Sequence, residues 1–136
     1  MKLVVVSTTI HGEKGYLPFD ALAAKSKFSD VVFVIAGDTN SAPFDLGKFQ
    51  CQAEYLKPED QDRFSISALI GWRSQRRRNA AFMRALELDP DFILTVDDDG
   101  APNWIGVAEV TGRERLVDDR DRRRARAIAV VEVASH

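Results

Sequence analysis

Three runs of apolar residues recur along the chain, and each leads into polar residues. They occupy residues 2–10 (KLVVVSTTI), 30–38 (DVVFVIAGD) and 92–96 (FILTV). Short runs rich in valine and isoleucine are typical of strands that are buried on both faces, as in a parallel sheet. Residues 51–56 (CQAEYL) form a weaker candidate strand. The pattern predicts an α/β fold with a Rossmann-like, mostly parallel sheet and flanking helices.

Two segments between the apolar runs have helical spacing. Residues 16–28 contain Pro18 near their start and complete a strand–helix–strand unit, whose crossover is predicted to be right-handed. Residues 71–88 give the clearer pattern, because apolar residues recur there at i, i+3, i+4 and i+7. The other stretches are loop-like at 41–50, turn-like at 57–63, and either a short strand or a helical turn at 65–70.

Arginines gather at the start of the second predicted helix, at Arg73, Arg76, Arg77 and Arg78. Cations at a helix N-terminus oppose the helix dipole, and a bound anion would relieve that conflict. The arginines can form a solvated basic face, or one of them can hold a diphosphate together with the helix N-terminal amides. Nucleic acid is disfavoured as a partner, since Trp72 is the one aromatic residue close to the arginines.

Three consecutive carboxylates, Asp97, Asp98 and Asp99, follow the third apolar run directly. Ionised carboxylates at the end of a buried strand need a cationic partner or water. Side chains at i and i+2 of an extended segment point the same way, so Asp97 and Asp99 can bind one ion. Hard oxygen ligands favour Mn²⁺ or Mg²⁺. The alternative is an acidic surface turn, whereas a calcium loop is disfavoured by the spacing.

The first two apolar runs end at the carboxyl edge of the predicted sheet. The acidic triplet is expected at the same edge. Thr8 and Thr9 lead into a loop with His11, and Asp38 ends the second run. Ligands of open α/β sheets bind at this edge. The alternatives are a plain surface loop and, for Asp38, turn formation with the following Thr39. His11 is interpreted as a loop residue in preference to a catalyst.

Composition limits the class of protein. The chain has 136 residues, 45% of them hydrophobic and 29% charged, with a net charge of -2, which is typical of one globular domain. The lone Cys51 leaves no internal disulfide and indicates a reducing compartment. The N-terminal apolar run is too short for a signal peptide, and no run approaches the roughly 20 residues of a membrane span. We therefore expect a cytoplasmic protein without a membrane span.

Four motifs together resemble a known family. KLVVVSTTI, DVVFVIAGD, RRNAAFMRALE and FILTVDDD, in this order, are similar to the nucleotide-sugar-binding half of GT-A-fold glycosyltransferases. The acidic triplet resembles that of the reversibly glycosylated polypeptides, or UDP-arabinopyranose mutases, and related glycosyltransferases. The resemblance covers about residues 2–104.

The resemblance implies a UDP-sugar donor and a role for each matching residue. It assigns nucleotide binding to Thr8, Thr9, Asp38, Arg78 and Asp98. The DxD metal motif corresponds to Asp97 and Asp99, with Mn²⁺ or Mg²⁺ as cofactor, while Pro102 and Trp104 resemble the segment after that motif. The implied reaction is glycosyl transfer to an acceptor, and no residue matches a catalytic base.

The likeness ends after Trp104. Residues 1–112 are expected to form the nucleotide-sugar-binding domain. Residues 113–136 hold an arginine-rich segment and a short apolar run, IAVVEV, which belong to the same domain or form a tail. Two alternatives to a glycosyltransferase remain: a non-catalytic remnant that binds a nucleotide or a protein, and a nucleotidyltransferase. Assembly into a homo-oligomer is left open.

Overall fold

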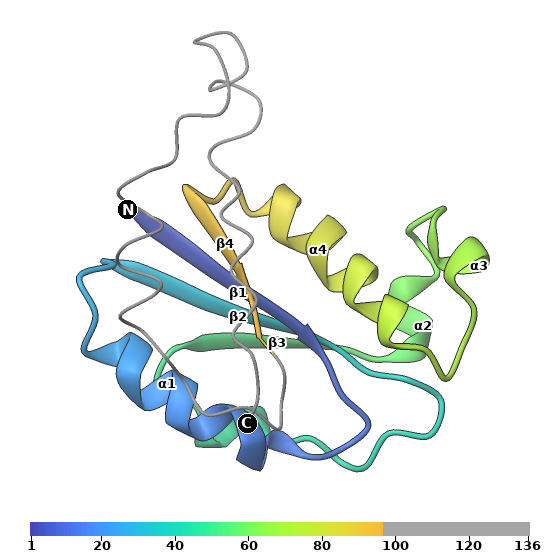
Figure 1. Ribbon diagram of the computed structural model, residues 1–136, viewed down its shortest axis with the longest axis horizontal. Helices are drawn as coiled ribbons and strands as arrows, with labels where there is room; N and C mark the ends of the chain where they lie inside the picture. The colour runs from blue at the N-terminus through green and yellow to red at the C-terminus, as the bar shows by residue number, and fades with distance from the viewer. Residues whose placement is uncertain (97–136) are drawn as a thin grey trace, which may run out of the picture.

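A parallel sheet with helices on both faces forms the centre of the computed structural model, which describes residues 1–96 (Figure 1). Its strands are β1 (Lys2–Thr8), β2 (Asp30–Ala36), β3 (Gln52–Leu56) and β4 (Phe92–Thr95), in the order β3-β2-β1-β4. Each neighbouring pair is parallel. The predicted α/β, Rossmann-like class is confirmed. The strand order reverses between β1 and β4, as in doubly wound folds.

The helical segments of residues 1–96 are mostly short. The two longest are α1 (Leu17–Ala24) and α4 (Arg78–Glu87), which lie on opposite sides of the sheet (Figure 1). The others are η1 (Glu13–Tyr16), η2 (Leu46–Lys48), α2 (Pro58–Gln61), α3 (Ser67–Ile70) and η3 (Gln75–Arg77). The ambiguous stretch 65–70 thus contains a helical turn, and the turn-like stretch 57–63 contains α2. None of the helices in this part of the chain has the length and apolar character of a membrane span.

The predicted start of the second helix is wrong. The pattern placed it at Gly71, but α4 begins at Arg78, after the 3₁₀ turn η3. Gly71 and Arg73 have positive φ angles of 77° and 56°, which a right-handed helix cannot contain. Arg73 therefore lies outside α4, and the supposed conflict between four arginines and one helix dipole does not arise.

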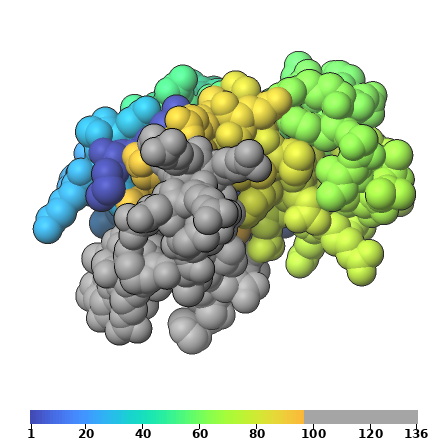
Figure 2. Space-filling view, turned by 90° about the horizontal axis from the view of Figure 1, so that it is seen from above, coloured from blue at the N-terminus to red at the C-terminus, as the bar shows by residue number. Residues whose placement is uncertain are grey.

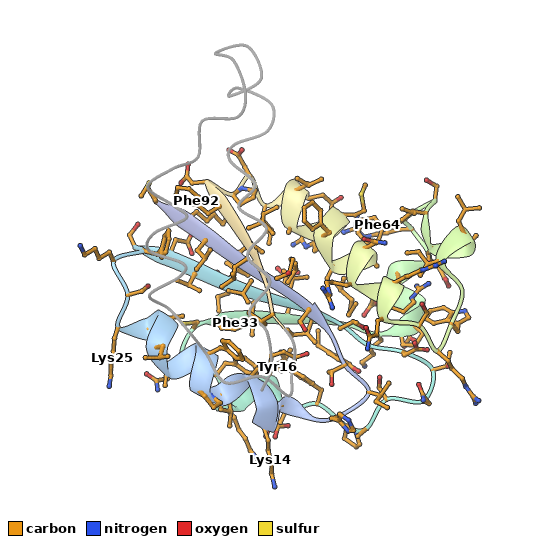
Figure 3. All side chains as sticks on the ribbon, in the orientation of Figure 1. Lys14, Tyr16, Lys25, Phe33, Phe64 and Phe92 are labelled. Atoms are coloured by element: carbon orange, nitrogen blue, oxygen red, sulfur yellow. The ribbon has the colours of Figure 1, made fainter. Side chains whose placement is uncertain are left out.

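Alternate residues of the strands pack against the two helical layers. Leu3, Val5 and Phe33 belong to a core cluster with Tyr16 and Phe19 from the α1 side. The intervening residues, such as Val4 and Val6, pack with Phe64 and with alanines of α4. Figure 3 shows Tyr16 and Phe33 on the α1 side and Phe64 on the α4 side. Both faces of the sheet are buried, which explains the continuous apolar runs in the sequence.

The connection from β2 to β3 has no α-helix, and aromatic rings cover the sheet in its place. Phe44 stacks on Tyr55 with ring centroids 4.6 Å apart and also lies beside Phe49, which contacts Phe33. These rings pack against the α1-side core.

Two buried carboxylates from the α1 side hold this connection in place. Asp20 accepts hydrogen bonds from the backbone N–H groups of Gln50 and Cys51, both at 2.9 Å. Glu13 accepts one from the backbone N–H of Asp45, also at 2.9 Å. The Cys51 thiol is half-buried and donates to the Asp20 carbonyl at 3.7 Å. Burial, together with Asp20, raises the pKa of Cys51 to about 12.

Gly37 is required by the close approach of Tyr55. A Cβ at position 37 would lie 2.6 Å from the Tyr55 Cζ, and the ring is fixed by its stack on Phe44. We expect Gly37→Ala to lower the free energy of unfolding by about 1–3 kcal/mol, measured by urea denaturation. Gly47→Ala is the matched control, because its Cβ would meet only the Asp45 carboxylate, at 3.1 Å. Equal stability of the two variants would contradict this packing.

Candidate functional site

A pocket of about 360 Å³ lies at the carboxyl edge of the sheet. It is formed by the loops that follow β1 and β2 and by the segment that precedes α4. Its lining comprises Thr8, Thr9, Ile10, His11, Asp38, Asn40, Arg73, Ser74 and Gln75. The structure therefore brings together three of the predicted nucleotide-binding residues, Thr8, Thr9 and Asp38. Arg78 is not part of this lining, and Asp97, Asp98 and Asp99 lie outside the described residues.

Hydrogen bonds of the threonines fix the loop after β1. The Thr8 hydroxyl donates to the Ala36 carbonyl at 2.8 Å, and the Thr9 hydroxyl accepts from the backbone N–H of His11 at 2.9 Å. The Ser41 hydroxyl donates to the Thr9 carbonyl at 2.9 Å. The Thr8 hydroxyl oxygen, which donates its proton within the fold, still offers lone pairs to a ligand donor.

Ser7 and Tyr16 connect the end of β1 to the chain that leaves β4. The Ser7 hydroxyl donates to the Val96 carbonyl at 2.6 Å and accepts from the Tyr16 hydroxyl at 2.9 Å. The backbone N–H of Val96 donates to the Val6 carbonyl at 3.2 Å. The residue that precedes the acidic triplet in the sequence is thus held beside the loop of Thr8. Neither Ser7 nor Tyr16 was predicted as part of the site.

Asp38 is 5% exposed, and backbone N–H groups surround its carboxylate. Oδ1 accepts from the N–H groups of Thr39 at 2.6 Å and Arg73 at 2.9 Å, and Oδ2 accepts from Ser74 at 3.1 Å. Burial, the largest single influence, raises the pKa of Asp38, but the hydrogen bonds from Arg73, Thr39 and Ser74 together lower it below its ordinary value. Asp38 therefore stays ionised and binds the segment before α4 to the end of β2.

Arg77 is fully buried and holds α2, α3 and the segment before α4 together. Its guanidinium donates to the Gln61 Oε1 from Nε and Nη2, to the carbonyl and hydroxyl of Ser67, and to the Gly71 carbonyl, at 2.6–3.3 Å. It also stacks on Trp72, at 3.8 Å from the ring centroid. In Figure 2 the green and yellow-green atoms of these segments form one protrusion at the end of the molecule.

The contacts of Arg77 use all five of its N–H donors, so this arginine has none left for a phosphate. Burial lowers the pKa of the Arg77 guanidinium, while the charges of Asp38 and Asp62 raise it. This role could not be predicted from the sequence, because arginine is rarely fully buried. Gly71, which interrupts the helical pattern just before the arginines, was the available signal that they do not share one helix.

The site offers polar and basic groups for a ligand, but no cluster of metal-binding side chains occurs within residues 1–96. There, no three His, Cys, Asp or Glu residues are grouped so that they could hold an ion. The predicted metal ligands, Asp97 and Asp99, directly follow Val96 in the sequence. The Asp38 carboxylate, whose two oxygens both accept backbone N–H groups, is committed to the loop before α4.

Comparison with known proteins yields no relative, since no protein-family model, curated protein or solved structure matches the chain. The likeness to GT-A glycosyltransferases therefore rests on the sequence motifs. The assignments of a nucleotide sugar, a metal ion and glycosyl transfer stay predictions.

Replacing Arg77 by lysine tests its structural role. We expect Arg77→Lys to lower the free energy of unfolding by about 3 kcal/mol, because one ammonium group cannot reproduce five forked hydrogen bonds and leaves Gln61 and Ser67 without their buried donor. The neighbouring Arg76 is exposed, so Arg76→Lys should change stability by less than about 0.5 kcal/mol. Urea denaturation of both variants provides the measurement. Similar losses in the two would contradict the assignment.

The Asp38 carboxylate should make stability depend on pH. We expect Asp38→Asn to be less stable than the wild type by about 2 kcal/mol at neutral pH, since an amide cannot accept on both sides. Because the folded-state pKa is lowered, this difference is complete above the ordinary aspartate pKa of about 3.9. It is lost as the pH falls through the lower pKa of the folded state. Urea denaturation of both proteins at several pH values measures it.

The exposed Asp62 supplies the control for this experiment. At neutral pH, Asp62→Asn should lower the free energy of unfolding by much less than Asp38→Asn does, because the Asp62 side chain is exposed. If the difference between the wild type and Asp38→Asn stayed constant down to strongly acidic pH, the carboxylate would not be the group that holds the loop.

Proposed function

We propose that this chain binds the nucleoside diphosphate part of a nucleotide sugar, in the presence of Mn²⁺ or Mg²⁺, and is the donor-binding part of a glycosyltransferase. The observation that carries the proposal is the meeting of three chain segments at one edge of the sheet. The loops after β1 and β2 line a pocket there, and β4 ends beside β1 just before the acidic triplet.

The strand order supports this position for the ligand. Ligands of open α/β sheets bind outside the carboxyl ends of the strands, where the strand order reverses. In the order β3-β2-β1-β4 that reversal falls between β1 and β4. The loop of Thr8 and Thr9 follows one of these strands, and Asp97, Asp98 and Asp99 follow the other. A pocket of about 360 Å³ also lies within the usual size range for small ligands.

The chemistry of the available groups supports a nucleotide with phosphates. Threonine hydroxyls and the Asn40 amide offer neutral hydrogen-bonding groups for a nucleoside, and Arg73 offers a positive charge for phosphate. When bound, a divalent ion at Asp97 and Asp99 would neutralise the diphosphate as it leaves the sugar. The proposed reaction breaks the bond between the anomeric carbon and the phosphate oxygen and transfers the sugar to an acceptor.

A thermal-shift experiment with a panel of nucleotides tests the proposal. We expect UDP and UDP-sugars to raise the Tm in the presence of Mn²⁺, with smaller effects without it. A ligand at 100 times its Kd adds about 2.7 kcal/mol to the free energy of unfolding. Asp99→Ala should abolish the Mn²⁺-dependent part of the shift and leave the fold intact. Asp62→Ala, which removes an exposed carboxylate outside the pocket, should keep it.

Each outcome has a defined meaning. If no nucleoside diphosphate shifted the Tm with or without Mn²⁺, the proposed function would be wrong. A shift with UDP that Asp99→Ala left unchanged would remove the metal assignment alone. Release of UDP from a UDP-sugar, followed by chromatography, would separate a catalyst from a binding protein. Release of pyrophosphate from UTP and a sugar phosphate would instead favour a nucleotidyltransferase.

A further inference from the structure

Arg73 has a strained backbone that a buried carboxylate holds in place. Its φ angle of 56° lies in the left-handed region, which is unfavourable for residues other than glycine. The N–H groups of Arg73 and of the next residue, Ser74, both donate to Asp38, which is 35 positions away from Arg73 in the chain. Strained residues of this kind occur preferentially at ligand sites, where the surrounding structure fixes them.

Arg73 is exposed and belongs to the lining of the pocket. It is the only lysine or arginine among the described residues of that lining. Within residues 1–96 its guanidinium forms no hydrogen bond or ion pair, while the nearby Asp38 is occupied by backbone N–H groups. The buried Arg77, by contrast, has all its donors satisfied inside the fold. The Arg73 guanidinium can therefore donate several hydrogen bonds to an anion in the pocket and contribute a positive charge.

From this geometry we infer that Arg73 is the phosphate-binding residue of the pocket, and that Asp38 is a positioning residue that holds Arg73 and does not itself contact the ligand. This inference rests on the proposed function for the identity of the ligand, a nucleoside diphosphate. It differs from the roles implied by the family resemblance, in which Arg78 contacts the nucleotide and Asp38 contacts the base or ribose. A guanidinium can hold two phosphate oxygens at once, which a lysine cannot reproduce.

Trp72 provides a local signal for binding at Arg73. It lies next to Arg73 in the chain, and its ring stacks on the buried Arg77. The chain contains two tryptophans, so Trp104→Phe leaves Trp72 as the single tryptophan, which can be excited selectively at about 295 nm or above. Titration of the Trp104→Phe protein with UDP and Mn²⁺ should change the Trp72 emission and give a Kd. The Tm shift with UDP measures the same differences between variants when they are made in the wild-type background.

In the Trp104→Phe protein, we expect Arg73→Ala and Arg73→Lys to weaken UDP binding by about tenfold or more, since a hydrogen bond to a charged group is lost or misplaced. Arg76→Ala removes an exposed arginine outside the pocket lining and should change the Kd by less than about twofold. Uridine, which has no phosphate, should bind equally to all these proteins. UDP binding that survived Arg73→Ala unchanged would overturn the inference and leave the proposed function standing.

Arg73→Gly gives an independent readout of the strained backbone. Glycine adopts a positive φ without steric cost, so the Tm should rise by a few degrees while UDP binding weakens as in Arg73→Ala. Opposite changes of stability and affinity are not expected of a residue with only a structural role. A fall in Tm in Arg73→Gly would contradict the argument that strain is held at this residue.

A double-mutant cycle tests the positioning role of Asp38. If Asp38 acts only through Arg73, Asp38→Asn should weaken UDP binding, and the Asp38→Asn/Arg73→Ala protein should bind no more weakly than Arg73→Ala alone. Uridine binding should be unaffected by Asp38→Asn. Additive losses, or a loss of uridine binding, would show that Asp38 contacts the nucleoside and would overturn its positioning role.

Titration with inorganic pyrophosphate separates this inference from the proposed function. Binding of pyrophosphate that depends on Arg73, without binding of any nucleoside diphosphate, would support the anion site and reject the nucleotide. The absence of both would reject Arg73 as a phosphate-binding residue together with the proposed function.

Discussion

Buried carboxylates that accept backbone N–H groups hold the loops of this fold in place. Glu13, Asp20 and Asp38 all come from the region of the first two strands, and each accepts from a loop about 30 or more positions later in the chain. A buried N–H without an acceptor costs about 1–3 kcal/mol, and an ionised acceptor forms the stronger hydrogen bonds. The hydrogen bonds of these three carboxylates therefore fix the positions of the loops relative to the sheet.

The central strand β1 explains why the candidate site forms where it does. It pairs with β2 on one side and with β4 on the other, and all three strands run in the same direction. Their carboxyl ends therefore meet at one edge, together with the loops that follow them. Ser7 strengthens this convergence through its short hydrogen bond to the Val96 carbonyl. The position of Val96, the residue that precedes the acidic triplet in the sequence, is therefore fixed by β1.

Most of the fold could be predicted from the sequence, because apolar runs of β-branched residues leave few alternatives to buried parallel strands. The shared edge of Thr8, Thr9 and Asp38 followed from the same reasoning. The start of α4 could not be predicted, since it depends on contacts between residues far apart in the chain. Asp38 fixes the backbone of Arg73, and Arg77 turns inward to Gln61 and Ser67. Local helical spacing contains no information about either contact.

The single cysteine has a practical consequence for work on this protein. Burial and the contacts with Asp20 raise the pKa of Cys51 to about 12, so its thiol stays almost entirely protonated at neutral pH. Maleimides and similar reagents attack the thiolate, so the natural cysteine should react far more slowly than an exposed one with an ordinary pKa. A cysteine introduced on the surface can then be labelled selectively while Cys51 stays in the sequence. Fluorescent or spin probes can be attached without altering the contacts between Cys51 and Asp20.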